Sequence, residues 1–168
     1  MKLFVKNRIG SFTESSFVLD EKGEKIFNVK GKLPIFSPTH KKRVCDMEGN
    51  KLYTVRNKFF KLFKHTCFVY DENGEKILEV TEKLFDFKHD YVVHGYKDDY
   101  SFEGKLIQFP NIKMDVLKNG VKIGYLSKDW NLVRDQYTLD IESEEDKALL
   151  VALVIAIDNV FDRKRKNK

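Results

Sequence analysis

Residues 148–157 have the sequence ALLVALVIAI, ten apolar side chains in a row, and this stretch decides the fold of the 168-residue chain. A membrane-spanning helix requires about 20 apolar residues, so the stretch is too short to cross a bilayer. It is also apolar on every side, which excludes a surface helix with one face in water. The rest of the protein must therefore surround it.

The residues on either side of the stretch predict a helix. Before it, Ser143 suits the N-cap and Asp146 stands where a capping-box acid would reach back. The acids at 144–146 and the basic residues at 163–166 would meet the positive and negative ends of the helix dipole. Four β-branched residues favour a strand locally: Val151, Val154, Ile155 and Ile157. The sorted charges outweigh them, and we predict a buried helix over residues 144–163.

The composition indicates one domain without an export signal. Hydrophobic residues make up 42% of the chain, with 14 Phe, which is enough for a sizeable core. Residues 1–10 contain neither a long apolar stretch nor a signal-peptide cleavage site. Cys45 and Cys67 are too few for a disulfide framework. We expect a single cytoplasmic domain at residues 1–163, without a transmembrane span, followed by a basic tail at residues 164–168.

The net charge of +5 is unevenly distributed along the chain. Residues 1–66 carry 15 Lys and Arg against 6 Asp and Glu, whereas residues 67–162 carry 11 against 20. Residues 163–168 add five basic side chains. A basic first third and a basic tail suit a polyanion such as phosphorylated lipid headgroups or nucleic acid. The alternative is a soluble protein with many exposed lysines, because charge blocks along a sequence need not form surface patches.

Four segments of the chain share one hairpin pattern. Each has a short apolar run, a turn with Gly, a Lys and a second apolar run; the segments are Phe17–Leu33, Arg43–Phe59, Phe68–Leu84 and Met114–Trp130. Their turn glycines are Gly23, Gly49, Gly74 and Gly120. In the first three an Asp stands three residues before the Gly, which suits a type I turn closed by a left-handed Gly. The apolar runs alternate with a period of two, which predicts antiparallel strands.

The number of strands predicts a barrel. Further strands come from the diverged segment Tyr91–Phe109 and from Leu3–Lys6 and Gln136–Ile141, which brings the total to about a dozen. Closing the sheet removes its edges, and the lumen hides the apolar helix. Eight strands fill their own barrel, so about twelve leave room for a helix about 10 Å across. We predict a mainly β fold: a closed antiparallel barrel around one hydrophobic C-terminal helix.

The turn repeat and three motifs resemble a known family. The motifs are VKGK at residues 29–32, HGYKDDYSFEG at 94–104 and QYTLDIESEEDKALLVALVIAID at 136–158. On these residues the chain is similar to the LURP-one-related family of the tubby C-terminal-like superfamily, which also includes phospholipid scramblases. Small bacterial members that consist of this domain alone match best. The resemblance covers essentially the whole chain and implies a twelve-stranded barrel threaded by a hydrophobic C-terminal helix.

The resemblance also implies a function at membranes. Tubby proteins bind phosphoinositide headgroups through basic residues on the barrel surface, whereas LURP-one-related proteins are mostly uncharacterised. No motif places those basic residues on this chain. By charge and turn location, the candidates for binding an anionic headgroup are Lys30, Lys32, Lys41, Lys42 and Arg43. The chain shows neither the palmitoylated cysteine cluster nor the proline-rich N-terminal segment of scramblases, which disfavours a scramblase role.

Catalytic and metal-binding patterns give no warrant for an enzyme. His65 and Cys67 would share one face of a strand, but a zinc site needs three or four protein ligands and no second pair has suitable spacing. The carboxylate pairs Asp98-Asp99 and Glu144-Glu145 fit a solvated turn and a helix start. Nucleotide-binding and hydrolase motifs do not occur. We expect no catalysis, no cofactor and no metal.

One further segment, Asn57–His65 (NKFFKLFKH), interleaves lysines with phenylalanines. Such a mixture suits an interfacial segment whose apolar groups enter the headgroup layer while its lysines meet anionic lipid. The alternative is a strand or loop that buries its Phe side chains in the barrel and leaves the lysines outside. Stacking on single-stranded nucleic acid is disfavoured, because no recognition signature accompanies the aromatic residues.

These observations lead to one hypothesis and two alternatives. The hypothesis is a non-enzymatic binding module that recognises an anionic phospholipid headgroup at the inner membrane surface. The first alternative is a protein-interaction or structural scaffold, and the second is an enzyme with a pocket at the barrel mouth. The decisive structural observation is whether the basic residues converge on one surface.

Overall fold

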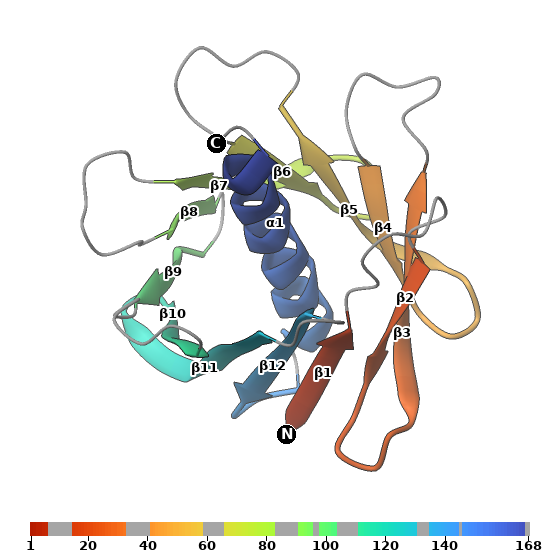
Figure 1. Cartoon of the computed structure of the whole chain (residues 1–168). Helices are drawn as coiled ribbons and strands as arrows, with labels where there is room; N and C mark the ends of the chain where they lie inside the picture. The colour runs from red at the N-terminus through yellow and green to blue at the C-terminus, as the bar shows by residue number, and fades with distance from the viewer. Residues whose placement is uncertain are drawn as a thin grey trace.

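The structure is a computed structural model, and it describes residues 1–6, 15–32, 41–58, 66–82, 91–95, 98–103, 111–130, 135–144 and 146–166. These residues form twelve strands and one helix (Figure 1). The elements are β1 (Lys2–Lys6), β2 (Ser15–Leu19), β3 (Lys25–Lys32), β4 (Lys41–Cys45), β5 (Lys51–Asn57), β6 (Thr66–Tyr70), β7 (Lys76–Glu82), β8 (Tyr91–Gly95), β9 (Tyr100–Glu103), β10 (Asn111–Lys118), β11 (Val121–Trp130), β12 (Asp135–Ile141) and α1 (Lys147–Lys166).

The strands lie in one antiparallel sheet in which neighbours along the chain are neighbours in space. β1 pairs with β2 on one side and with β12 on the other, so that the strand order closes the sheet into a barrel. The first and last strands pair along the whole length of β1, from Lys2 opposite Asp140 to Lys6 opposite Gln136. The predicted mainly β fold with one C-terminal helix is confirmed.

Short turns with left-handed residues join the predicted hairpins. The glycines of the three Asp-containing turns have φ values of +81° to +95°: Gly23, Gly49 and Gly74. In each turn the Asp carboxylate accepts a hydrogen bond at 2.8 Å from the backbone N–H of the residue after the Gly. The fourth turn differs, because Asn119 (φ 53°) and Gly120 (φ 77°) are both left-handed, as in a two-residue type I′ hairpin.

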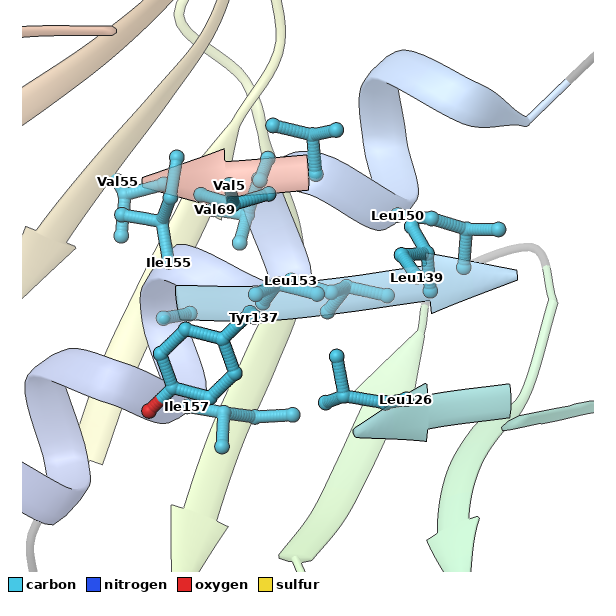
Figure 2. Packing of buried hydrophobic residues seen from close by; sticks show 14 of the residues in the cluster. Val5, Val55, Val69, Leu126, Tyr137, Leu139, Leu150, Leu153, Ile155 and Ile157 are labelled. Atoms are coloured by element: carbon cyan, nitrogen blue, oxygen red, sulfur yellow. The ribbon is translucent and has the colours of Figure 1, made fainter. Parts of the chain in front are cut away.

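The helix lies inside the barrel and forms the centre of the core (Figure 1). Every side chain of α1 from residue 150 to residue 160 is buried. Inward-facing strand residues surround it, and Figure 2 shows Ile155 of α1 beside Val55 of β5 and Val69 of β6. Valines occupy the inward positions of most strands, because a branched, compact side chain suits the space between a sheet and a helix. The predicted burial of the apolar stretch is confirmed.

The helix begins and ends three residues later than predicted, at Lys147 and Lys166. Asp146 occupies the N-cap, since its carbonyl oxygen accepts a hydrogen bond from the Leu150 backbone N–H at 2.9 Å. Its carboxylate instead accepts a hydrogen bond from Lys118 Nζ at 2.7 Å. The predicted N-cap at Ser143 and its capping box are therefore wrong, whereas Asp146 does stand at the positive end of the helix dipole, as predicted. The ion pair to β10 holds Asp146 at the start of the helix.

The barrel has two different ends (Figure 1). At one end, the turn end, lie the hairpin turns described above and the start of α1. At the other end, the exit end, β3 stops at Lys32, β4 starts at Lys41 and α1 stops at Lys166. The helix direction agrees with its polar contacts, because Asp146 meets β10 at the turn end and Asp158 meets Tyr137, near the exit-end start of β12.

Candidate functional site

Four of the five predicted binding residues form two facing pairs on neighbouring strands. In the antiparallel pair β3–β4, Lys30 stands opposite Arg43, and Lys32 stands opposite Lys41. Such positions place Cβ atoms about 4.5–5.5 Å apart. The fold therefore brings the basic residues of the two segments to one place on the sheet.

The row of cations continues onto the next strand. Arg56 of β5 stands opposite Lys41 of β4, so three adjacent strands carry a basic residue in line with Lys32. We call the set Lys30, Lys32, Lys41, Arg43 and Arg56 the basic face. Arg56 could not be singled out from the sequence, because it is an isolated basic residue in KLYTVRN and only the strand register aligns it with Lys41.

Strand alternation places the basic face on the outside of the barrel. Val29 and Val44 are buried in the core, and the residues next to them along each strand point the other way. Lys30 is exposed, whereas Arg43 is half-buried. On β5, Arg56 is likewise exposed. Lys30 and Arg56 are therefore accessible to a ligand in water.

Lys42, the fifth predicted binding residue, lies apart from the others. It is only 9% exposed, and it stands opposite Gly31 of β3 and Val55 of β5, in an inward-facing row. The run KKR in the sequence contains two outward-facing residues and one inward-facing residue, because side chains alternate along a strand. Lys42 belongs to the interior, so we leave it out of the basic face.

Two polar atoms on the basic side of the sheet have no hydrogen-bond partner among the described residues. They are Arg43 Nε and Asn28 Oδ1, both enclosed by neighbouring atoms. Within the same part of the chain, neither Lys30 nor Arg43 forms an ion pair with a carboxylate. Because Arg43 Nε is enclosed and Asn28 Oδ1 is an acceptor, a phosphate or carboxylate oxygen would have to accept its hydrogen bonds from the terminal guanidinium nitrogens of Arg43 and from Lys30. The site has the chemistry of an anion receptor.

An aromatic pair borders the basic face on β6. Phe68 stands opposite Arg56, and Tyr70 stands opposite Thr54, one row further toward the turn end. The two rings meet edge to face, with centroids 6.5 Å apart and an interplanar angle of 71°. The two rings lie two residues apart on the strand and are both half-buried, whereas Val69 between them is fully buried, so they share the outer face of β6.

Acidic residues gather at the turn end, away from the basic face. Those in the described turns and before the helix are Asp20, Glu21, Glu24, Asp46, Glu48, Asp71, Glu72, Glu75, Asp98, Asp99, Glu142 and Glu144. Lys118 compensates part of this charge, with Nζ 2.7 Å from Asp146 Oδ2 and 3.5 Å from Asp98 Oδ2. The hydrogen bond to Asp146 raises the pKa of Lys118, and burial raises the pKa of the neighbouring Tyr100 to about 12.

Two predicted features fall largely outside the described residues. Of the lysine–phenylalanine segment 57–65, only Asn57 and Lys58 are described, and Asn57 is buried at 4% exposure. His65 also lies outside, whereas Cys67 is fully buried, with Sγ donating to the carbonyl oxygen of Arg56 at 3.4 Å. Among the residues that the structure describes, no three His, Cys, Asp or Glu side chains group as metal ligands would.

No helix in the described ranges is both long enough and apolar enough to span a bilayer. A sequence profile of the family described as LURP-one-related matches residues 1–158. The uncharacterized protein YxjI of Bacillus subtilis (strain 168) is 27% identical over 166 residues, which cover 96% of this chain and 94% of that protein. No solved structure matches the chain.

Proposed function

The chain belongs to the LURP-one-related family, and from that premise we propose that it is a non-enzymatic module that binds anionic phospholipid headgroups at a membrane surface through the basic face. We further propose that the barrel is of the tubby C-terminal-like type. The proposal also includes a peripheral position at the inner surface of the membrane.

The pairing of like charges is the observation that carries this proposal. Lys30 faces Arg43 and Lys41 faces both Lys32 and Arg56, and like charges in facing positions destabilise a sheet. The barrel does not require cations at these outward positions, since any polar residue would suit them. An anion bound between Lys30 and Arg43 would convert their repulsion into charge-assisted hydrogen bonds.

The spread of the basic face over three strands also suits a lipid surface. The cations lie on three adjacent strands, which are about 4.8 Å apart, so their charges are spread over an area larger than one headgroup. Such a spread surface meets several anionic headgroups at once. Each Lys or Arg near an anionic membrane contributes about 1 kcal/mol, which is roughly a fivefold gain in binding.

Co-sedimentation with vesicles tests the proposal. Vesicles of phosphatidylcholine, with or without phosphatidylserine, are mixed with the protein at low salt and pelleted. We expect binding only to the phosphatidylserine vesicles, and we expect the double variant K30Q/R43Q to bind roughly 20-fold or more weakly. The control K22Q/K51Q, which removes two exposed lysines of the turn end, should bind as the wild type does. Equal and negligible binding to both vesicle types would refute the proposal.

A protein-interaction scaffold is the second candidate, and exposed apolar side chains on β11 favour it. Val121 is 66% exposed and Tyr125 is 52% exposed. Lys122 holds the Tyr125 ring in place, with Nζ 3.5 Å from the ring centroid and 2.9 Å from Asp115 Oδ1. A protein partner bound through this surface would resist high salt and would be lost in V121D, whereas lipid binding would weaken with salt.

A further inference from the structure

We propose that the protein stands on an anionic lipid surface on its exit end, so that the last turn of α1 shares the contact with the basic face and the turn end points away. This inference rests on the proposed lipid binding and adds the orientation of the barrel. The alternative orientation is side-on, with only the outer surface of β3 to β5 against the lipid.

The basic face extends to the rim of the barrel at the exit end. Lys32 is the last residue of β3 and Lys41 is the first residue of β4, and the two are paired. On the next strand, Arg56 lies opposite Lys41 near the end of β5, and Lys58 directly follows β5. Both side chains are exposed. The cations are therefore concentrated at the rim, where an end-on contact would use them.

The helix runs well past the middle of the barrel. Its side chains are buried from Leu150 to Val160, and the helical backbone continues to Lys166. Six more helical residues extend about 9 Å further along the helix axis. The last four of these residues are the basic run 163–166, so the basic run forms the end of α1 at the exit end (Figure 1).

The turn end and the exit end carry charge of opposite sign, and this difference would orient the molecule near an anionic surface. The acidic turns described above would be repelled by an anionic surface, while the rim cations and the helix end would be attracted. In addition, a helix C-terminus carries a negative dipole end that basic residues offset. Only the end-on orientation brings both sets of cations to the lipid and keeps the acidic turns at the largest distance from it.

Two labelling positions distinguish the orientations. Gln136 lies at the exit-end rim on β12, is separated from the basic face on β3 by β1 and β2, and is uncharged. Met47 lies at the turn end, in the turn between β4 and β5, which are two of the strands that carry the basic face. Its side chain is 50% exposed. The variants Q136C and M47C are labelled with an environment-sensitive dye. Cys45 and Cys67 are at most 3% exposed and are not expected to react in the folded protein; wild type is the control.

Phosphatidylcholine vesicles with and without phosphatidylserine are then added to each labelled protein. End-on binding predicts a blue shift of the dye at residue 136 and none at residue 47, on phosphatidylserine vesicles only. A shift at residue 47, or no shift at either residue while the protein still sediments with the vesicles, overturns the orientation and leaves the lipid binding intact. If no protein sediments with either vesicle type, the proposed function itself has failed.

The helix end provides a second, independent measurement. The variant R163Q/K164Q/R165Q/K166Q keeps the basic face and removes the charges of the last helical turn. End-on binding predicts that its affinity for phosphatidylserine vesicles falls by about tenfold or more. Unchanged affinity would overturn the shared contact. A thermal unfolding midpoint of the variant equal to that of the wild type would show that the variant is folded.

Discussion

Lys128 and Asp158 form an ion pair inside the barrel, with Nζ 3.5 Å from Oδ1 and side chains that are only 2% and 4% exposed. Tyr137 completes the cluster, because its hydroxyl donates to the same Oδ1 at 2.7 Å and its ring centroid lies 4.6 Å from Lys128 Nζ. The cluster joins α1 to β11 and β12 in a core that is mostly apolar among the described residues. A displaced helix would leave these charges unpaired, so the cluster selects one position of the helix along the barrel.

Removing one partner of this ion pair should be strongly destabilising. We expect K128M and D158L each to lower the free energy of unfolding by about 3–5 kcal/mol, because each leaves a buried charge without its partner. The double variant K128M/D158L should lose clearly less than the sum of the two. Urea denaturation of the four proteins measures this coupling. The matched control is K122M, which breaks a half-exposed pair with Asp115 and should lose about 1 kcal/mol or less. Additive losses would show that the buried pair is not coupled.

A charge in the middle of the helix should prevent folding. Val154 is fully buried and Ile155 is 5% exposed, so V154D and I155D each place an unpaired carboxylate in the centre of the barrel. We expect both variants to be insoluble or unfolded by circular dichroism. The conservative variant I155V should fold and lose about 0.5–1.5 kcal/mol. A folded, soluble V154D would contradict the central position of the helix.

The stability of the protein should fall at alkaline pH through Tyr100. This side chain is 3% exposed, and burial raises its pKa from 10.0 to about 12. Between those two pH values the unfolded chain has lost the phenolic proton while the folded protein still holds it, so the free energy of unfolding decreases as pH rises. The pKa of Lys118 is raised in the folded state as well, and its effect has the same sign. Urea denaturation from about pH 9 to 11.5 should show a smaller decrease for Y100F than for the wild type.

The repeat and the apolar stretch were sufficient to predict the fold, because both depend on local chemistry. The turn at Gly74 needs a left-handed residue, and residues 148–157 need a surrounding wall whatever the rest of the chain does. The start of the helix could not be predicted in the same way. Asp146 is held by Lys118, which is distant in sequence, and this ion pair replaces the capping interaction that Ser143 suggested.

The candidate site was predicted in part, because charge is visible in a sequence and strand register is not. Four of the five predicted residues share the outer face, but Lys42 points inward. Side chains alternate along β4, so the middle residue of KKR faces the interior while its two neighbours face outward. Arg56 was missed for the same reason, because only the pairing of β4 with β5 sets it opposite Lys41. The alternation rule would have separated Lys42 from its neighbours once the strand boundary was known.

Gly120 and Gly124 should respond in opposite ways to larger side chains, because different constraints act on them. At Gly120 a Cβ would meet open space, but the φ of +77° is unfavourable for Ala and better tolerated by Asn. At Gly124 a Cβ would collide with the carbonyl oxygen of Asp140 on the neighbouring strand β12. We therefore expect G120N to be more stable than G120A, and G124N to be less stable than G124A, with losses of about 1–3 kcal/mol at position 124. Thermal unfolding of the four variants measures which of Ala and Asn is more stable at each position. If the same residue were more stable at both positions, backbone conformation would not be the limiting factor at Gly120 and space would not be the limiting factor at Gly124.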